Sequence, residues 1–381
     1  MNNCQGLSKV TQKLEAQFQV YLRLCVLLYA DDTVLLSDTV NDLQHQLNVF
    51  HEYSKLWHLK VNEEKTKIIV FGNGRLPNET RFVYNNNPIE IVNNFKYLGV
   101  HFTGKGFSQF NIKQLYDKGI KAMYGAIAKC REHNLSMECK FDIFDKAIKP
   151  VILYGCEVWG FCNYKLLEQL HLKFCKHVLG LKSSTPNFMV YGELGRFPIN
   201  IDVKVRMVGY WAKVIDRSKN KLSNTMYNIL SNFNTPWLTY IKNIFIECNL
   251  INIFEDKLFP SMEWLKINVS NILKDNFIYN WQNDVFNSPK GSNYRLFKYD
   301  FIFENYLHEL PPKHSKIFCK FRTCNFKLPI ETGRWEDIPR EERKCNICNF
   351  NEIGDEYHYL FNCRDTTIQA NRKKIPTKIL L

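Results

Sequence analysis

Two adjacent aspartates stand between apolar runs in the segment VLLYADDTVLLS, residues 26–37. The flanking runs predict a β-hairpin with the pair at its tip. Short hairpin turns favour Asn-Gly or Asp-Gly, so two carboxylates at the tip need another explanation. Oxygen ligands on a rigid apolar hairpin suit Mg²⁺, which keeps positions free for substrate phosphates. Asp31 and Asp32 are therefore candidate magnesium ligands, with solvated turn residues as the alternative.

A second group of candidate ligands closes the chain in CNICNFNEIGDEYHYLFNC, residues 345–363. Cys345 and Cys348 have the C-x2-C spacing that lets two thiolates bind one tetrahedral metal. His358 and Cys363 can complete a Cys3His set, and zinc suits sulfur and imidazole ligands. Two buried thiols beside a surface histidine are the alternative. The sequence predicts a zinc site here.

The segment KHSKIFCKFRTCNFK, residues 313–327, carries five Lys or Arg, no acid and three phenylalanines. Basic groups in such a segment can contact phosphates, and aromatic rings can stack on unpaired bases. An amphipathic helix with a solvated basic face is the alternative interpretation. The candidate nucleic-acid contacts are Lys313, Lys316, Lys320, Arg322 and Lys327.

Composition limits the class of protein. The 381 residues contain 51 Lys or Arg against 38 Asp or Glu, a net charge of +13. That surplus favours a polyanionic partner, either nucleic acid or an anionic membrane surface. No apolar run reaches the roughly 18–20 residues of a membrane span. Thirteen cysteines, mostly scattered singly, suit reduced thiols in the cytosol or nucleus.

Hydrophobic periodicity and turn residues place these groups on elements. After the hairpin, a helix is expected from about residue 38 to residue 57, capped by Ser37 or Asp38. The chain then alternates between short strands and turns as far as about residue 105, and is mainly helical beyond it. The expected elements are a strand over 68–71, two short strands within 82–102 with a turn at Asn85–Pro88, and helices over 110–130, 137–149 (broken by Pro150) and 164–179 (ending at Gly180).

YADD between two apolar strands resembles the palm hairpin of reverse transcriptases. Five later stretches resemble, in the same order, the polymerases of non-LTR (LINE-type, jockey-like) retrotransposons. The resemblance runs in register from about residue 24 to residue 363 and is thin over 216–305. The stretches are LLSDTVNDLQHQLNVFHEYSKLWHLKVNEEKTKIIVF, FKYLGVHF, FDKAIKPVILYGCEVWG, YGELGRFPI and FKLPIETGRW.

The resemblance implies an α+β fold with four parts. A partial right-hand palm of antiparallel hairpins plus a helix would be followed by a helical thumb, a further helical region and a small zinc-binding end. It implies RNA-directed DNA synthesis with Mg²⁺, an RNA template and a DNA primer, and no membrane. The expected bounds are 1–105 for the palm, 106–215 for the thumb, 216–310 for the helical region of unknown role and 311–381 for the basic segment and zinc cluster.

The same resemblance implies roles for single residues. Asp31 would be a metal ligand, and Asp32 would assist it as a ligand or by orienting the site. Tyr29 would lie near the primer-end nucleotide. Lys65 or Lys67 would approach the triphosphate, where a cation can stabilise the leaving group; solvated surface lysines are the alternative. The residues that would shape the primer grip are Tyr97, Leu98 and Gly99.

One expected part of the palm is missing. Polymerases of this kind need another metal-binding aspartate on an earlier strand, and before Asp31 the one acidic residue is Glu15, in a polar segment. The fingers would also lie upstream. We therefore expect the chain to be the C-terminal portion of such a polymerase, inactive alone. An RNA-binding remnant with a structural zinc site and no catalysis is the alternative function.

Overall fold

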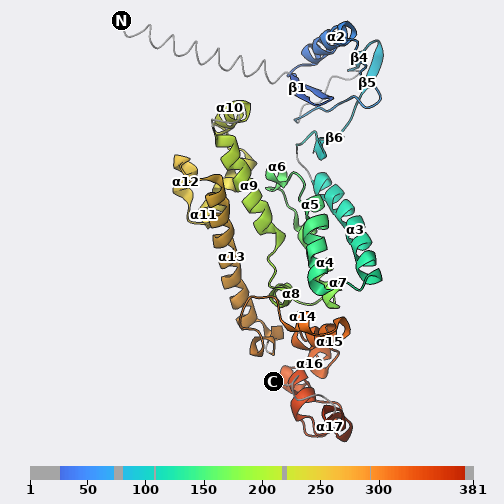
Figure 1. Cartoon of the computed structure of the whole chain (residues 1–381), viewed down its shortest axis with the longest axis vertical. Helices are drawn as coiled ribbons and strands as arrows, with labels where there is room; N and C mark the ends of the chain where they lie inside the picture. The colour runs from blue at the N-terminus through green and yellow to red at the C-terminus, as the bar shows by residue number, and fades with distance from the viewer. Residues whose placement is uncertain (1–25, 73–79, 107–108, 217–220, 292, 374–381) are drawn as a thin grey trace.

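The computed structural model describes residues 26–72, 80–106, 109–216, 221–291 and 293–373. Short strands gather at one end of the molecule, helices form the long body, and the last helices lie at the opposite end (Figure 1). This mixture of helices with small, mostly antiparallel sheets confirms the expected α+β class. Glu15, the one acidic residue that precedes Asp31 in the sequence, lies outside the described residues, so the structure does not test its expected lack of a metal-binding role.

The strand-rich end contains three small sheets and one helix. Strands β1 and β2 pair antiparallel, β5 lies between β3 and β4, and β6 pairs antiparallel with β7. The elements are β1 (Val26–Tyr29), β2 (Asp32–Leu35), α2 (Val40–Leu56), β3 (Lys67–Ile68), β4 (Phe82–Tyr84), β5 (Asn87–Ile91), β6 (Asn94–Tyr97) and β7 (Val100–Thr103).

A small hydrophobic core holds this end together. Helix α2 packs over the β3–β5–β4 sheet, and Leu35 at the end of β2 packs against the same core. Because Leu35 is continuous with the β1–β2 hairpin, this contact anchors the hairpin that carries the paired aspartates. The buried residues of the core are Leu47, Ile68, Phe82, Tyr84 and Ile89.

Two local expectations for this end were wrong. The cap of α2 is Thr39 rather than Ser37 or Asp38, because Thr39 is extended and its Oγ1 accepts a hydrogen bond from the backbone N–H of Asp42 over 3.1 Å. The stretch 82–103 forms four strands, not two, because it folds as two consecutive hairpins.

The turn expected at Asn85–Pro88 is shorter than predicted. Asn85 and Asn86 take φ values of 49° and 64° and form the turn, so Pro88 lies inside β5, opposite Val83. Proline fits there because β3 pairs with β5 only further along, at residues 90 and 91. The outer edge of β4 is covered by Gln44, whose side chain bonds both the N–H and the C=O of Val83.

The helical body follows from residue 109. Its main helices are α3 (Gln109–Glu132), α4 (Met137–Ile143), α5 (Lys149–Ile152), α6 (Cys156–Trp159), α7 (Lys165–Leu179), α8 (Asn187–Leu194), α9 (Ile199–Ile215), α10 (Lys221–Leu230), α11 (Pro236–Glu247), α12 (Ile251–Asp256), α13 (Met262–Asn287), α14 (Tyr306–Glu309) and α15 (Pro312–Arg322). Single turns between them are η1 (Phe144–Ile148), η2 (Pro289–Gly291) and η3 (Tyr294–Leu296).

Pro150 does not end the helix that was expected over 137–149. The chain runs from α4 through the π-turn η1 into α5, and Pro150 occupies the first turn of α5. A proline in a first helical turn lacks only an N–H that has no partner within its own helix. The chain therefore remains helical from α4 to α5, through Pro150.

The described residues within 216–310 share one hydrophobic core with the preceding helices. Helix α13 runs along α9 (Figure 1), and Trp211 of α9 stacks on Phe254 of α12 with ring centroids 5.5 Å apart. The core extends from Val100 of β7 to Cys319 of α15. The two helical regions separated in the sequence analysis are thus packed as one body.

The C-terminal end is a small separate cluster. It contains α16 (Pro329–Thr332), η4 (Arg340–Glu342), the π-turn η5 (His358–Asn362) and α17 (Thr366–Arg372). Its buried centre is formed by three cysteines, with Tyr359 and Ile368 packed against them. Among the described residues, no helix has the length and apolar character required to cross a bilayer.

Candidate functional site

The paired aspartates lie at the exposed tip of the β1–β2 hairpin. Tyr29 pairs with Asp32, so Ala30 and Asp31 form the two-residue turn. Ala30 has a φ of 53°, a left-handed conformation that costs a residue with a Cβ about 1–2 kcal/mol. Asp31 and Asp32 are exposed, and Tyr29 keeps 63 % of its surface accessible. The hairpin thus presents two carboxylates and an aromatic ring to solvent.

No third ligating side chain joins this pair within the part of the chain that the structure describes. The convergent group of His, Cys, Asp or Glu found there lies at the C-terminal end instead. Two carboxylates fit part of a magnesium site, because Mg²⁺ takes one or two protein carboxylates together with waters and substrate phosphates. They do not supply the ligand set that two metal ions require.

Lys65 and Lys67 differ in their surroundings. The Nζ of Lys67 in β3 lies 2.9 Å from the carboxylate of Glu90, its register partner in β5. Lys65 is exposed, in the turn before β3, where its backbone N–H donates to Asn62 Oδ1 over 3.0 Å. Among the described residues, no carboxylate forms an ion pair with Lys65. Of the two lysines, Lys65 is therefore the one whose ammonium group is not already paired within the described residues and could contact an anionic ligand.

Leu98 and Gly99 form the turn between β6, which ends at Tyr97, and β7. Their φ values are 46° and 85°. The hydroxyl of Tyr154, after helix α5, donates a hydrogen bond of 2.8 Å to the carbonyl oxygen of Leu98. A Cβ on Gly99 would lie 2.6 Å from the Tyr154 ring. Tyr154 thus joins this turn to the helical body, a contact that its position among apolar residues in the sequence did not signal.

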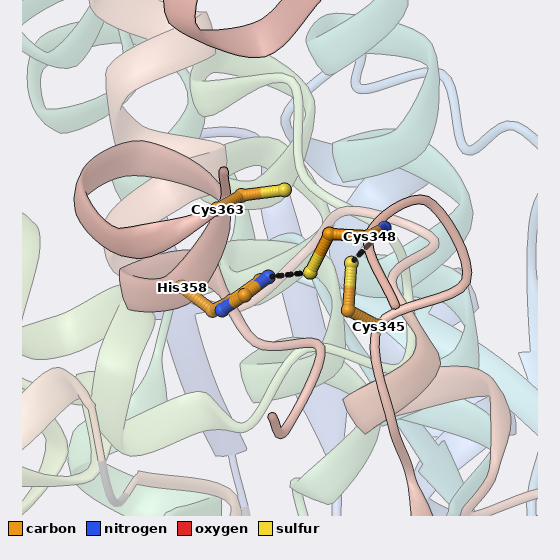
Figure 2. Close-up of side chains that lie close together, drawn as sticks. All are labelled: Cys345, Cys348, His358 and Cys363. Carbon is orange, nitrogen blue, oxygen red and sulfur yellow. Dashed lines mark hydrogen bonds between the residues drawn. The ribbon is translucent and has the colours of Figure 1, made fainter. Parts of the chain in front are cut away.

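The four predicted zinc ligands converge (Figure 2). Cys345, Cys348, His358 and Cys363 are all buried, and their ligand atoms lie within 4.8 Å of one another. Cys348 Sγ lies 3.4 Å from His358 Nε2. Tetrahedral zinc, with bonds of about 2.0–2.3 Å, places neighbouring ligand atoms about 3.5–3.8 Å apart. The donor types and their spacing therefore fit a closed zinc site.

The surroundings prepare these groups for metal binding. The imidazole Nδ1 of His358 lies 2.7 Å from Glu352 Oε2, a contact that leaves Nε2 directed at the cluster. Burial alone would raise the pKa of the Cys345 thiol, but hydrogen bonds from the backbone N–H of Cys348 and from Tyr359 lower that pKa to about 6. The sequence did not lead us to predict the contact of Glu352 with His358. Its position in the loop between the Cys345–Cys348 pair and the His358–Cys363 pair was the signal that could have found it.

The basic segment forms helix α15 and the loop after it. Lys313 and Lys327 are exposed, and Lys316 and Lys320 are partly exposed. Arg322 differs from the other four: it is buried, with 8 % of its surface accessible. A helix with a basic outer face is present, but the buried guanidinium of Arg322 does not fit the phosphate contact that was predicted for it.

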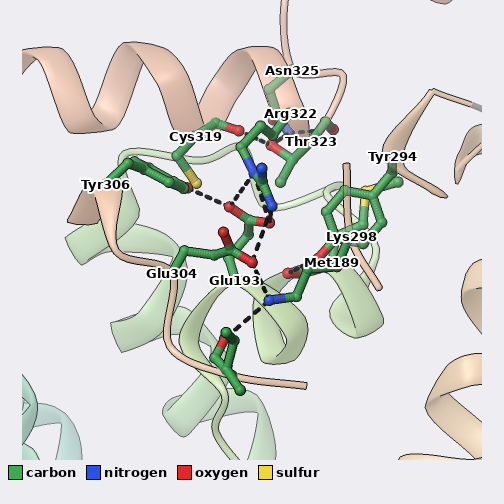
Figure 3. Close-up of polar contacts among 11 residues, drawn as sticks. Met189, Glu193, Tyr294, Lys298, Glu304, Tyr306, Cys319, Arg322, Thr323 and Asn325 are labelled. Carbon is green, nitrogen blue, oxygen red and sulfur yellow. Dashed lines mark hydrogen bonds and ion pairs between the residues drawn. The ribbon is translucent and has the colours of Figure 1, made fainter. Parts of the chain in front are cut away.

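Arg322 belongs to a buried ionic network between α8 and α15 (Figure 3). Its Nε lies 3.0 Å from the carboxylate of Glu193, and its Nη2 lies 3.1 Å from Glu304. Tyr306 donates to Glu193, and Lys298 pairs with Glu304. Burial raises the pKa of Glu193, and Arg322 counteracts part of that rise. The network fixes α15 to the helical body.

The first quarter of the chain matches a known family. Residues 5–102 match reverse transcriptase (RNA-dependent DNA polymerase). This part of the chain is therefore similar to reverse transcriptases. It includes the Asp31–Asp32 hairpin, helix α2 and nearly all of the β6–β7 hairpin. The paired aspartates therefore lie inside the part of the chain that is similar to reverse transcriptases.

One relative extends the similarity to about half of the chain. Over 192 residues the chain is 28 % identical to a Drosophila melanogaster protein described as RNA-directed DNA polymerase from mobile element jockey. The match covers 48 % of this chain and 20 % of the fly protein, so the chain spans about one fifth of that relative. No solved structure shows a significant match. The kinship with non-LTR retrotransposon reverse transcriptases is confirmed.

Proposed function

We propose that this chain forms the palm hairpin, thumb and C-terminal end of an RNA-directed DNA polymerase that extends a DNA 3′-end on an RNA template. The observation that carries the proposal is the exposed pair Asp31 and Asp32 at the hairpin tip, inside the part of the chain that matches the reverse transcriptase family. The similarity to the jockey polymerase supports a mobile element as the source. A net charge of +13 suits nucleic acid substrates.

In this proposal Asp31 and Asp32 hold Mg²⁺, with Asp31 as the principal ligand. When bound there, the ion supplies the positive charge that activates the primer hydroxyl and stabilises the leaving pyrophosphate. Tyr29 packs near the primer-end nucleotide, and Lys65 contributes a cation to the triphosphate. Tyr97 at the end of β6 and the turn of Leu98 and Gly99, held by Tyr154, position the primer end.

We also propose that polymerisation needs a part of the protein that precedes this hairpin. The described residues supply two acidic ligands, fewer than a two-metal site requires. The matched region covers 20 % of the jockey polymerase, which leaves room in a longer protein for the fingers and an earlier aspartate. In this proposal the described residues alone do not polymerise, because they hold fewer acidic ligands than two metal ions require.

The test is primer extension by a chimera in which the part of the jockey polymerase that precedes the matched region is fused to this chain. With an RNA template, a DNA primer, nucleotides and Mg²⁺, we expect extension that Asp31→Asn reduces by at least about 10³-fold. Glu52→Gln, which changes an exposed carboxylate on α2, is the matched control and should leave extension unchanged. Equal extension by Asp31→Asn and the unsubstituted chimera would exclude the assigned site.

For the C-terminal cluster we propose a structural zinc ion held by Cys345, Cys348, His358 and Cys363. The support is a closed, buried donor set with a carboxylate–histidine contact behind it. Four protein ligands leave no open position for a reacting group, so the proposed role is stability rather than catalysis.

A further inference from the structure

The helical body contains a cavity that the polymerase proposal does not use. It has a volume of about 260 Å³ and lies between the last turns of α3 and α7, helix α4 and the start of α15. Ile127, Phe174 and Val178 are among its apolar lining residues. Because two other lining residues, Arg131 and His177, are exposed, the cavity reaches the molecular surface.

The polar lining of this cavity is basic. Arg131 of α3, Lys140 of α4, His177 of α7 and Lys316 of α15 all line it, and no Asp or Glu appears among its lining residues. Within the described part of the chain, Arg131, Lys140 and Lys316 form no ion pair. Basic side chains from four helices, three cations and one imidazole, thus converge, and the described residues that line the cavity hold no carboxylate between them.

These cations affect one another. Burial, followed by the charges of Lys140 and Arg131, lowers the pKa of Lys316. Burial, and then Lys316 together with Arg131 and Lys140, lowers the pKa of His177. Mutual repulsion of this kind disfavours the unliganded state, and a bound anion would relieve it. Apolar walls around charges of one sign also strengthen the field inside a cleft.

Helix dipoles explain only part of the cluster. Arg131, Lys140 and His177 stand in the last turns of their helices, where a cation is favourable in any protein. Lys316 lies in the middle of α15, away from its end. Its side chain passes over Gly180, where an added Cβ would lie 3.2 Å from its Cδ. Lys316 therefore reaches this group by tertiary packing.

We propose that this cavity is a phosphate-binding site that takes a phosphodiester group of the nucleic acid backbone. The choice of nucleic acid, rather than free phosphate, rests on the proposed function. The site is separate from the Asp31–Asp32 hairpin, and it places Arg131 and Lys140 beside Lys316, which the sequence already predicted as a nucleic-acid contact. Three cations and one imidazole can neutralise one or two backbone phosphates.

The experiment measures binding of a fluorescein-labelled RNA–DNA hybrid to the whole chain by anisotropy between about 50 and 200 mM salt, without nucleotides or added Mg²⁺. The triple variant Arg131→Gln, Lys140→Gln, Lys316→Gln should bind about tenfold or more weakly. The slope of log K against log salt should become shallower by about 1–2, because a phosphate contact that is lost no longer releases counterions on binding.

Two control variants distinguish an effect of this site from an effect of the lost net charge, and the melting temperature shows whether the fold is kept. Lys165→Gln, Lys213→Gln, Lys242→Gln removes the same charge at exposed positions that do not line the cavity, and should change binding less than about threefold. The triple variant Arg131→Lys, Lys140→Arg, Lys316→Arg keeps the charges and should keep the binding. The melting temperature of the glutamine variant at the cavity should equal or exceed that of the wild type, since repulsion is relieved.

Unchanged affinity and salt slope in the glutamine variant at the cavity would overturn the proposal, as would an equal loss in the variant at the three exposed lysines. A third outcome would also overturn the proposal. Inorganic phosphate could raise the melting temperature of the wild type but not of the glutamine variant, while both bind the hybrid equally. The ligand of the cavity would then be free phosphate. Asp31→Asn should leave hybrid binding intact. A failure of polymerisation in the chimera therefore remains distinguishable from a failure of this site.

Discussion

At the scale of single residues, the exposure of the paired aspartates depends on Ala30. This alanine adopts the left-handed conformation that normally selects Gly or Asn, and the next two residues then project from the hairpin tip. Strained residues cluster at functional sites, so the conformation of Ala30 supports the proposed role of the two carboxylates. Asp31 and Asp32 show no protein partner within the described residues, which is consistent with that proposal.

The structure distinguishes two lysines that the sequence left equivalent. In the jockey chimera, Lys65→Ala should reduce primer extension by about 10²-fold or more, because an unpaired ammonium near the triphosphate is lost. Lys67→Ala should reduce extension less than about tenfold, since Lys67 is already paired with Glu90. Steady-state extension rates of the two variants are the measurement. A larger loss for Lys67→Ala than for Lys65→Ala would reverse the assignment.

At the scale of elements, specific contacts hold two segments of proposed function in place. One is the β6–β7 turn, which Tyr154 contacts, and the other is the loop and π-turn that carry the proposed zinc ligands. In each, a short segment with little core of its own is fixed by a specific contact. The carbonyl of Leu98 accepts from Tyr154, and His358 is held by Glu352. Both segments are open to direct tests.

Gly99→Ala should destabilise the protein by about 1–3 kcal/mol, because the new Cβ meets both a positive φ and the Tyr154 ring. The matched control is Gly106→Ala, which has a φ of +86° but nothing within 4 Å of the added Cβ. Urea unfolding of both variants isolates the cost of the tyrosine contact. Equal destabilisation would show that Tyr154 does not restrain the turn.

The purified chain should retain about one zinc ion, measured by atomic absorption. Cys345→Ser should lose that ion and lower the melting temperature, because zinc binding contributes to folding at such sites. Cys139→Ser changes an exposed free cysteine of α4, so it should retain both the zinc and the stability. Zinc retention by the Cys345 variant equal to that of the control would contradict the proposed ligand set.

At the scale of the whole molecule, one helical core extends from β7 to α15, and the network around Glu193 and Arg322 joins its middle to its C-terminal part. A buried ion pair is costly to desolvate and becomes destabilising when one partner is removed. The remaining charge of Arg322 would keep Glu304 as its partner in that case. The loss of one charge from the network should therefore destabilise the fold without abolishing it.

Glu193→Gln should lower the free energy of unfolding by about 3 kcal/mol. Glu247→Gln removes the partner of Lys204 at a half-exposed position and should cost about 0–1 kcal/mol. Denaturant unfolding followed by circular dichroism compares these two identical substitutions. Similar small losses in both would mean that the buried network does not support the fold.

A fragment of residues 1–105 should be poorly soluble. Its core in the described residues is small, Leu28 of β1 is 72 % exposed, and Val100 would lose the helices that bury it. Exposed apolar strands promote aggregation. Sedimentation and thermal melting are the measurements, and a soluble monomer with a cooperative transition would contradict the expectation. The longer fragment 1–310, which keeps most of the helices that cover Val100, serves as the comparison.

The sequence by itself determined the features that depend on neighbouring residues. The hairpin, the limits of α7 and the grouping of Cys345, Cys348, His358 and Cys363 follow from local patterns of apolar, turn and cysteine residues. Tertiary structure alone decided which groups meet across long separations. Arg322 is buried because Glu193, far away in the sequence, lies opposite it. Lys316 joins Arg131 at one cavity because α15 packs on α7, which packs on α3. Periodicity assigns a residue to a face of its own helix, but only packing determines what that face contacts.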